Sequence, residues 1–186
     1  MRITRLAGMF LLLIAAGSLR VSAETLLTEA QALKIVFPKA QSVETQVRPV
    51  TPAIRFELRK QTDLHFPESE FRCFVGHGKQ DIDGYAVIMN EIGKHEYITF
   101  IVGVSPKGEV GDVAVMEYRE SRGEEVKDRR FLSQFHGKKL SDPIAVDRDI
   151  ENYTGATLSS HAIATGVRKA LAVVQLFYLS PSGAQP

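Results

Sequence analysis

The chain has 186 residues, 44% hydrophobic and 24% charged, a length that suits a single domain with its own hydrophobic core. Its 23 basic and 22 acidic residues give a formal net charge of +1. The only cysteine, Cys73, excludes an internal disulfide, a Cys-x-x-Cys-His haem attachment and a thiolate metal cluster.

The first 23 residues have the three parts of a cleavable signal peptide. A basic start at residues 1–5 precedes an apolar run at residues 9–16 that is too short to span a bilayer, and Val21-Ser22-Ala23 offers the small residues of a cleavage site. We expect cleavage after Ala23 and a periplasmic or otherwise extracytoplasmic protein; the alternative is an uncleaved anchor. Residues 1–23 hold three arginines and no acid, so the 20 basic and 22 acidic residues that remain give a net charge of about −2, which argues against nucleic acid as a partner.

Two helices are predicted near the start of the mature chain. Residues 28–37 begin with a capping residue, Thr28, carry apolar residues at helical spacing and stop before Pro38. A second helix is predicted to begin at Thr51-Pro52, because proline is tolerated in the first turn.

The hydrophobic period then changes to two, which predicts consecutive strands. Residues 105–108, Ser-Pro-Lys-Gly, should form the turn of an antiparallel hairpin. Cys73 shares a strand face with Phe71 and Val75, which favours a small buried side chain over a reactive thiol. A block of strands with helices at both ends predicts an α+β fold, an antiparallel sheet flanked by helices. The predicted strands are residues 71–75, 84–89, 97–104 and 110–118.

A long apolar segment follows Thr154-Gly155-Ala156-Thr157 and runs to Leu179. A glycine among small residues allows a tight turn, and hydroxyl residues before an apolar run are typical of a helix start. We therefore expect a turn that opens into a long C-terminal helix, packed against the sheet by its apolar face. Arg168, Lys169 and Gln175 fall off that face.

The ends of the mature chain complete this organisation. No segment after the signal peptide has the apolar length that we expect of a transmembrane helix. Residues 180–186 are expected to be a disordered tail, which leaves residues 24–179 as a single domain.

The start of the C-terminal helix suits a phosphate. The first turn of a helix has unpaired backbone N–H groups and the positive end of the helix dipole, and the Thr157 hydroxyl could carry the phosphate as an ester. Ordinary helix capping is the alternative. A tetrapeptide pattern such as that of residues 154–157 occurs by chance in roughly 1 in 100 chains of this length.

Residues 154–160, Thr-Gly-Ala-Thr-Leu-Ser-Ser, resemble the [Ser/Thr]-Gly-Ala-Thr signature of the FMN-binding domain family. That family includes the C and G subunits of sodium-pumping NADH:quinone oxidoreductases and of Rnf-type complexes. The resemblance implies that FMN is attached by a phosphoester to Thr157, installed by an FAD-dependent FMN transferase.

Three further segments resemble the family, in its order and spacing, so that the resemblance spans about residues 70–178. Residues 104–110 are similar to its strand-turn-strand core. Residues 118–123 are similar to its Glu-Thr-Pro-Gly loop, with Ser-Arg in place of Thr-Pro, and residues 131–138 to its Phe-x-x-Gln-Phe-x-Gly-Lys segment. The resemblance implies cofactor contacts at Thr154, Gly155, Ala156, Leu158, Ser159, Glu120, Arg122 and Gly123.

One position departs from the family pattern. Three residues before the first hydroxyl residue the family has Asp, and this chain has Glu151, with Asp149 two residues upstream. The carboxylate is kept with a reach one methylene longer, so Glu151 is the predicted recognition residue for the transferase.

Cations near a flavin would raise its potential, because reduction adds negative charge near N1 and the C2 carbonyl. Arg119, Arg122 and Lys138 are candidates for that effect, and solvated surface charge is the alternative for each. The five histidines lack metal-binding spacing, and no GxGxxG nicotinamide fingerprint is present. We therefore predict no metal site and no catalytic residue of the chain's own.

These observations favour an extracytoplasmic electron carrier with covalent FMN, which works with a membrane or periplasmic redox partner rather than as a stand-alone enzyme. The alternative is a secreted binding or interaction domain of the same fold without covalent flavin.

Overall fold

The computed structural model describes residues 24–180. The predicted signal peptide, residues 1–23, and residues 181–186 of the predicted tail lie outside the described residues.

Six strands form one antiparallel sheet in the order β1-β6-β5-β4-β3-β2. Strands β2 to β6 follow one another as a meander, and β1 pairs with the outer edge of β6. The strands are β1 (Glu24–Thr25), β2 (Ser42–Pro49), β3 (Glu70–His77), β4 (Ile82–Ile92), β5 (Tyr97–Val104) and β6 (Val110–Tyr118).

The helices begin where the sequence predicts. Thr28 caps α1 in a capping box with Gln31, and the Thr51 hydroxyl caps α2 by accepting a hydrogen bond from the N–H of Ile54. The α-helices are α1 (Glu29–Val36), α2 (Pro52–Thr62), α3 (Arg129–Leu132) and α4 (Thr157–Val174), which continues as a π-helical turn at Gln175–Leu179; short 3-10 turns lie at Glu124–Lys127 and Ser133–Phe135.

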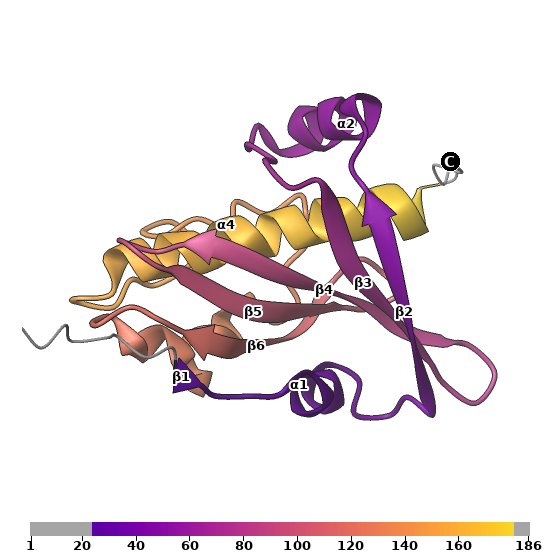
Figure 1. Ribbon diagram of the computed structural model, residues 1–186, viewed down its shortest axis with the longest axis horizontal. Helices are drawn as coiled ribbons and strands as arrows, with labels where there is room; N and C mark the ends of the chain where they lie inside the picture. The colour runs from indigo at the N-terminus through magenta and orange to yellow at the C-terminus, as the bar shows by residue number, and fades with distance from the viewer. Residues whose placement is uncertain (1–23, 181–186) are drawn as a thin grey trace, which may run out of the picture.

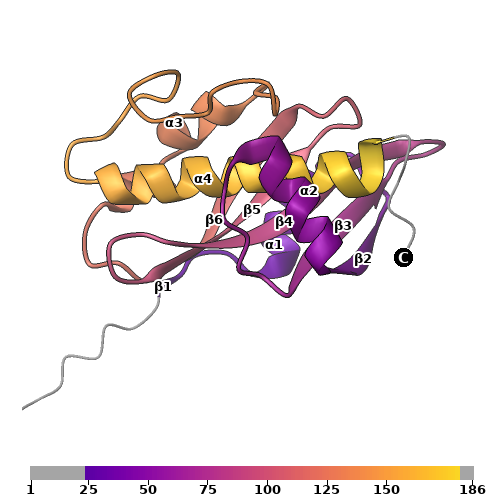
Figure 2. The same cartoon turned by 90° about the horizontal axis from the view of Figure 1, so that it is seen from above.

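Helices cover both faces of the sheet. Helix α4 lies across one face and α1 across the other (Figure 1). Seen from above, α2 crosses α4, and the segment that contains α3 lies beside it (Figure 2). The larger core cluster lies between α4 and the sheet and includes Phe100 and Ile163, and the smaller one lies between α1 and the sheet and includes Phe74 and Ile101. The predicted α+β fold is confirmed.

The four predicted strands and the turn at residues 105–108 are confirmed, the turn by a hydrogen bond from Gly108 N to Ser105 O at 2.9 Å. Cys73 is fully buried, and burial raises the pKa of its thiol to about 12, which agrees with a packing role. Strand β2 was not predicted from the sequence. It is an edge strand whose Val43 and Val47 are exposed. It therefore lacks the alternation of apolar and polar residues by which a strand with one buried face is recognised.

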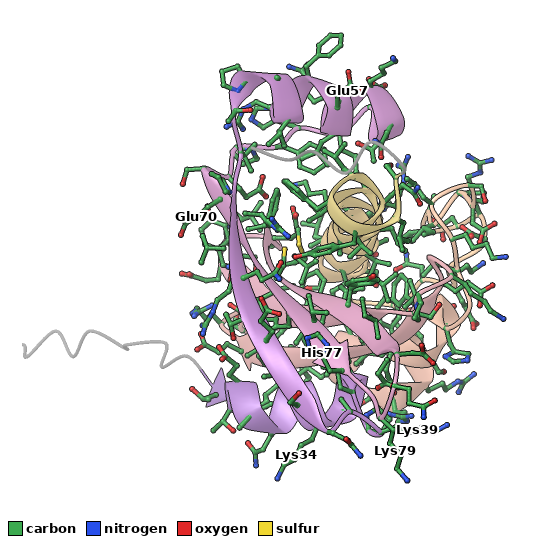
Figure 3. All side chains as sticks on the ribbon, turned by 90° about the vertical axis from the view of Figure 1, so that its right-hand side faces the viewer. Lys34, Lys39, Glu57, Glu70, His77 and Lys79 are labelled. Atoms are coloured by element: carbon green, nitrogen blue, oxygen red, sulfur yellow. The ribbon has the colours of Figure 1, made fainter. Side chains whose placement is uncertain are left out.

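The expectation that Lys169 lies off the packed face of α4 is wrong. Figure 3 looks along α4 and shows it enclosed by the sheet, α2 and the segment that contains α3. Lys169 is only 5% exposed, and its Nζ lies 2.8 Å from Glu91 Oε1 and 3.2 Å from Glu68 Oε1. A helix covered on several sides is buried around most of its circumference, so no single apolar face describes it.

By length and mean hydropathy, Thr157–Leu179 would also pass as a membrane span, contrary to the expectation from the sequence. However, 67% of its apolar window is buried inside the protein, so this helix forms the core of the domain.

Candidate functional site

The tetrapeptide forms the predicted turn into α4. Gly155 has a φ of 87°, a left-handed conformation that favours glycine, and the N–H of Ala156 donates to Tyr153 O at 2.9 Å to close the turn. Helix α4 then begins at Thr157, with Ala156 at its N-cap. The hydroxyl-bearing side chain of Thr157 is exposed at this start.

The N-terminus of α4 is suited to an anion. Alanine at the N-cap offers no side-chain acceptor, and the first turn contains no acidic residue. Within residues 24–180, no side-chain hydrogen bond caps this helix start. The first backbone N–H groups of an 18-residue helix therefore keep their hydrogen-bonding capacity, and the helix dipole adds positive potential.

The loop after β6 packs directly against this helix start. The Tyr118 hydroxyl donates to Arg122 O at 2.6 Å and lies 3.1 Å from Ser159 Oγ. Gly123 has a φ of 85°, and a Cβ there would lie 3.0 Å from Ser159 Oγ and 3.2 Å from Ala156 Cα. Only glycine combines this conformation with this approach, which accounts for the glycine in the loop.

The turn between β4 and β5 forms another wall. Oε1 of Glu120 accepts hydrogen bonds from the backbone N–H of His95 at 2.6 Å and of Glu96 at 3.0 Å. A Cβ at Gly93 would lie 2.7 Å from the same oxygen, so glycine makes room for the carboxylate. Burial opposes ionisation of Glu120, but the backbone N–H donors of Glu96, His95 and Lys94 outweigh it and lower the pKa of this carboxyl. Glu120 therefore holds the turn that carries Lys94 and His95.

These elements enclose a cavity of about 640 Å³, within the size range of small-molecule sites. The structure brings together seven of the residues predicted from the sequence, namely Glu120, Arg122, Gly155, Ala156, Thr157, Leu158 and Ser159, and adds Lys94, His95 and Ser121. Lys94 and Arg122 bring positive charge to the lining around the α4 N-terminus, beside the Glu120 carboxylate. Leu158, 51% exposed, adds apolar surface beside Thr157.

Two other predicted contacts stand next to the cavity rather than in its lining. Gly123 supports the wall through its contacts with Ser159 and Ala156. Thr154 is exposed at the start of the turn.

The predicted recognition residue, Glu151, lies on the exposed approach to the turn. Its backbone is held by the Gln134 side chain, which accepts from Glu151 N at 2.6 Å and donates to Glu151 O at 3.4 Å. Its side chain is exposed, and within residues 24–180 the Glu151 carboxylate has no hydrogen bond or ion pair. The Glu151 carboxylate is therefore accessible to another protein.

The Asp149 carboxylate, two residues upstream, is already engaged within the protein. It accepts from Lys138 Nζ at 2.8 Å, from Ala145 N at 2.8 Å and from Ile144 N at 3.1 Å. Burial opposes its ionisation, but these donors outweigh burial and lower the pKa of Asp149. Lys138, which pairs with Asp149, is not among the residues that line the cavity.

The structure does not bring Arg119 into the cavity lining either. Its guanidinium pairs with Glu117 and donates to Thr99 Oγ1 at 3.1 Å and to Tyr97 O at 3.3 Å, on the surface of β5 and β6. Of the three cations that the sequence offered, only Arg122 lines the cavity.

Sequence reasoning missed Lys94, His95 and Asn152. Asn152 donates from Nδ2 to Thr157 Oγ1 at 3.1 Å. Lys94 and His95 lie in an ordinary hairpin turn. Asn152 lies between Glu151 and Thr154, which match positions of the family pattern, but it matches no such position itself. The glycine at position 93, between two strand patterns, was the available signal for a close approach at the turn.

Comparison with known proteins finds similarity in the part of the chain that builds this site. Residues 93–172 match the model of the FMN-binding domain family. The G subunit of the Na⁺-translocating ferredoxin:NAD⁺ oxidoreductase complex of Acetobacterium woodii is 24% identical over 159 residues, which are 80% of this chain and 74% of that protein. The G subunit of the proton-translocating ferredoxin:NAD⁺ oxidoreductase complex of Clostridium ljungdahlii is 32% identical over 101 residues, 50% of this chain and 54% of that protein.

The fold is that of a solved structure as well. The crystal structure of Shewanella oneidensis NqrC matches with a TM-score of 0.53 and 16% identity, over 73% of this chain and 82% of that one. The resemblance stated from the sequence is confirmed.

Proposed function

We propose that this chain, which contains an FMN-binding domain over residues 93–172, carries FMN as a phosphoester on Thr157 and serves as an electron carrier outside the cytoplasmic membrane. One observation carries the proposal: the exposed Thr157 hydroxyl stands at a helix N-terminus without a side-chain cap in the described residues, in a cavity that Lys94 and Arg122 line. This is the place in the domain where a phosphate ester would be both formed and stabilised.

The residues present fit FMN. The open N-terminus of α4 and Arg122 suit the phosphate, and the 640 Å³ cavity has room for a ring system. Gly155 leaves open space, because a Cβ there would meet nothing within 4 Å. Lys94 and Arg122 would favour negative charge in the cavity, and Leu158 would supply apolar contact.

FMN bound here would supply the electron-transfer chemistry, and the chain would supply position and electrostatics. Covalent attachment suits the proposed compartment. A cofactor that is held only by non-covalent forces is lost when the surroundings contain little of it, whereas an ester is not subject to that loss.

The proposed partners follow from the site and from the relatives. Attachment requires an FAD-dependent FMN transferase, and the free carboxylate of Glu151 is the group that it would recognise. The two curated relatives are subunits of ion-translocating ferredoxin:NAD⁺ oxidoreductase complexes, which supports a membrane redox protein as donor or acceptor. Export rests on the signal-peptide pattern, and the N-terminal sequence of the mature protein tests it: Glu24 is expected.

A second function stays open because of Glu151. If the transferase requires the shorter Asp, the chain would be a secreted binding domain of the same fold that takes a small anion at the α4 N-terminus without covalent flavin. An intact mass equal to that of the bare chain after exposure to transferase, FAD and magnesium would favour this alternative.

The test of the proposal is co-expression with an FMN transferase, followed by denaturation. The wild-type protein should keep flavin fluorescence on a denaturing gel, and Thr157→Ala should lose it. Thr154→Ala removes the other hydroxyl of the tetrapeptide and is the matched control, which should stay fluorescent. A fluorescent Thr157→Ala band would exclude Thr157 as the site.

A further inference from the structure

Asn152 touches the proposed acceptor hydroxyl. Its Nδ2 lies 3.1 Å from Thr157 Oγ1, and this is the only hydrogen bond of its side chain within residues 24–180. Its Oδ1 is buried and has no partner in the same part of the chain. The amide is thus directed at Thr157 without a second polar contact that would explain its presence.

The residues on either side fix the backbone of Asn152. Glu151 is held at N and O by Gln134, and the Tyr153 ring packs edge-on against Phe131, with centroids 5.6 Å apart. The carbonyl of Tyr153 accepts from Ala156 N, the bond that closes the turn into α4. The Asn152 side chain therefore projects from an anchored backbone toward the first residue of an anchored helix.

We propose that Asn152 is a positioning residue for covalent attachment, which holds the Thr157 hydroxyl in the orientation that attacks the flavin donor. This inference rests on the proposed function. A hydrogen bond from Nδ2 occupies one lone pair of Oγ1 and restricts rotation about the Cα–Cβ bond of Thr157. The other lone pair and the hydroxyl proton are left for the reaction.

The step that Asn152 would assist is a phosphoryl transfer from FAD. Thr157 Oγ1 forms a bond to the phosphorus of the FMN half, the bond from that phosphorus to the bridging oxygen breaks, and AMP leaves with that oxygen. The hydroxyl proton passes to a base of the transferase, and no electrons are exchanged. A freely rotating hydroxyl would spend part of its time facing away from the donor, so a fixed rotamer raises the rate of the chemical step.

The test is the rate of FMN attachment, followed by intact mass with purified transferase, FAD and magnesium. Asn152→Ala removes the amide, and Asn152→Leu keeps its size without a hydrogen bond. Both should lower the maximal rate about tenfold, the effect of one hydrogen bond, with the KM for the acceptor protein unchanged. Tyr153→Phe is the matched control, because it removes from the same loop a buried hydroxyl that has no hydrogen-bond partner in the described part of the chain; it should react at the wild-type rate.

The outcomes separate this inference from the proposed function. If the wild-type chain gains no flavin, or Thr157→Ala gains it, the proposed function fails. If the wild-type chain reacts and either Asn152 variant keeps its maximal rate, the positioning role alone is overturned. A slower reaction that comes only with a raised KM or a lowered Tm would also overturn it, because it would assign Asn152 to loop order.

Discussion

Gly123 and Gly155 flank the start of α4 and have nearly the same backbone conformation, with φ of 85° and 87°. They differ in their surroundings. A Cβ at Gly155 would meet open space, whereas a Cβ at Gly123 would press on Ser159 Oγ, Tyr118 Oη and Ala156 Cα. A substitution at Gly155 therefore tests backbone strain alone, whereas one at Gly123 tests the same strain together with close packing.

We predict that Gly155→Ala costs about 1 kcal/mol, the strain of a left-handed alanine. Gly123→Ala should cost about 2 to 3 kcal/mol, because overpacking adds to the same strain. Denaturant unfolding of both variants measures the difference. Equal losses would show that the loop after β6 does not press on α4.

Site residues that belong to a recognisable backbone motif could be predicted from the sequence. Thr157 and Gly155 belong to a turn that opens a helix, and each such position has its own signature. Lys94 and Asn152 do not. Lys94 lines the cavity because the hairpin turn lies near the start of α4, and a long-range arrangement of that kind leaves no local pattern. Asn152 contacts Thr157 five residues further along the chain, but its residue type matches no recognised position.

At the scale of elements, the hairpin of β4 and β5 and the loop after β6 are joined through Glu120. Its carboxylate takes the two backbone donors that the hairpin turn would otherwise expose. Glu120 was expected to contact the cofactor; it lines the cavity, and its hydrogen bonds go to the turn. These hydrogen bonds fix the turn that contains Lys94 and His95.

We predict that Glu120→Gln destabilises the fold at neutral pH by about 1 kcal/mol, because a neutral acceptor replaces a charged one. The pKa of Glu120 is lowered in the folded state from its ordinary value of 4.5. Its contribution is therefore present above pH 4.5 and is lost as the pH falls through the folded-state pKa.

The measurement is the free energy of unfolding as a function of pH. The difference between the wild-type protein and Glu120→Gln should shrink below pH 4.5. Glu96→Gln, which changes an exposed carboxylate of the same turn, is the control and should have little effect. A difference that does not change with pH would contradict the role of the charge.

Elements with an apolar face toward the core were predictable, and those without one were not. Strands β5 and β6 have the predicted bounds, because their apolar residues pair across the hairpin. Strand β2 exposes both Val43 and Val47, so its residues resemble a polar connection. Nothing in its local sequence says that it pairs with β3.

At the scale of the molecule, α4 connects the site to the far end of the core. It begins at Thr157 and passes between the sheet and α2 (Figure 3). Lys169 lies in this passage between two carboxylates, Glu68 and Glu91. Burial raises the pKa of Glu91 and Glu68 adds to that effect, while Lys169 opposes it.

We predict that Lys169→Met destabilises the protein by about 3 kcal/mol, because it leaves two carboxylates without their cation. The loss should be smaller at acidic pH. A carboxyl whose pKa is raised in the folded state takes up a proton on folding, so the stability of the variant falls as the pH rises through that pKa. Lys60→Met, on the exposed face of α2, is the control and should stay within about 0.5 kcal/mol of the wild-type protein. An equally small effect at Lys169 would mean that the cluster does not bind the helix to the sheet.

The layered arrangement was predictable as a class, an antiparallel sheet with helices around it. The burial of Lys169 was not, because helical periodicity assumes one covered face, and α4 is covered by the sheet, α2 and the segment around α3. Partners that surround a helix lie far from it in sequence, so the spacing of its own residues cannot reveal them.

The most direct test of covalent attachment at Thr157 is peptide mass mapping of the wild-type chain after reaction with transferase, FAD and magnesium. FMN should be found on the fragment that begins α4, with fragmentation assigning it to Thr157 rather than to Thr154 or Ser159. A bare fragment, or flavin on either of those neighbours, would contradict the account.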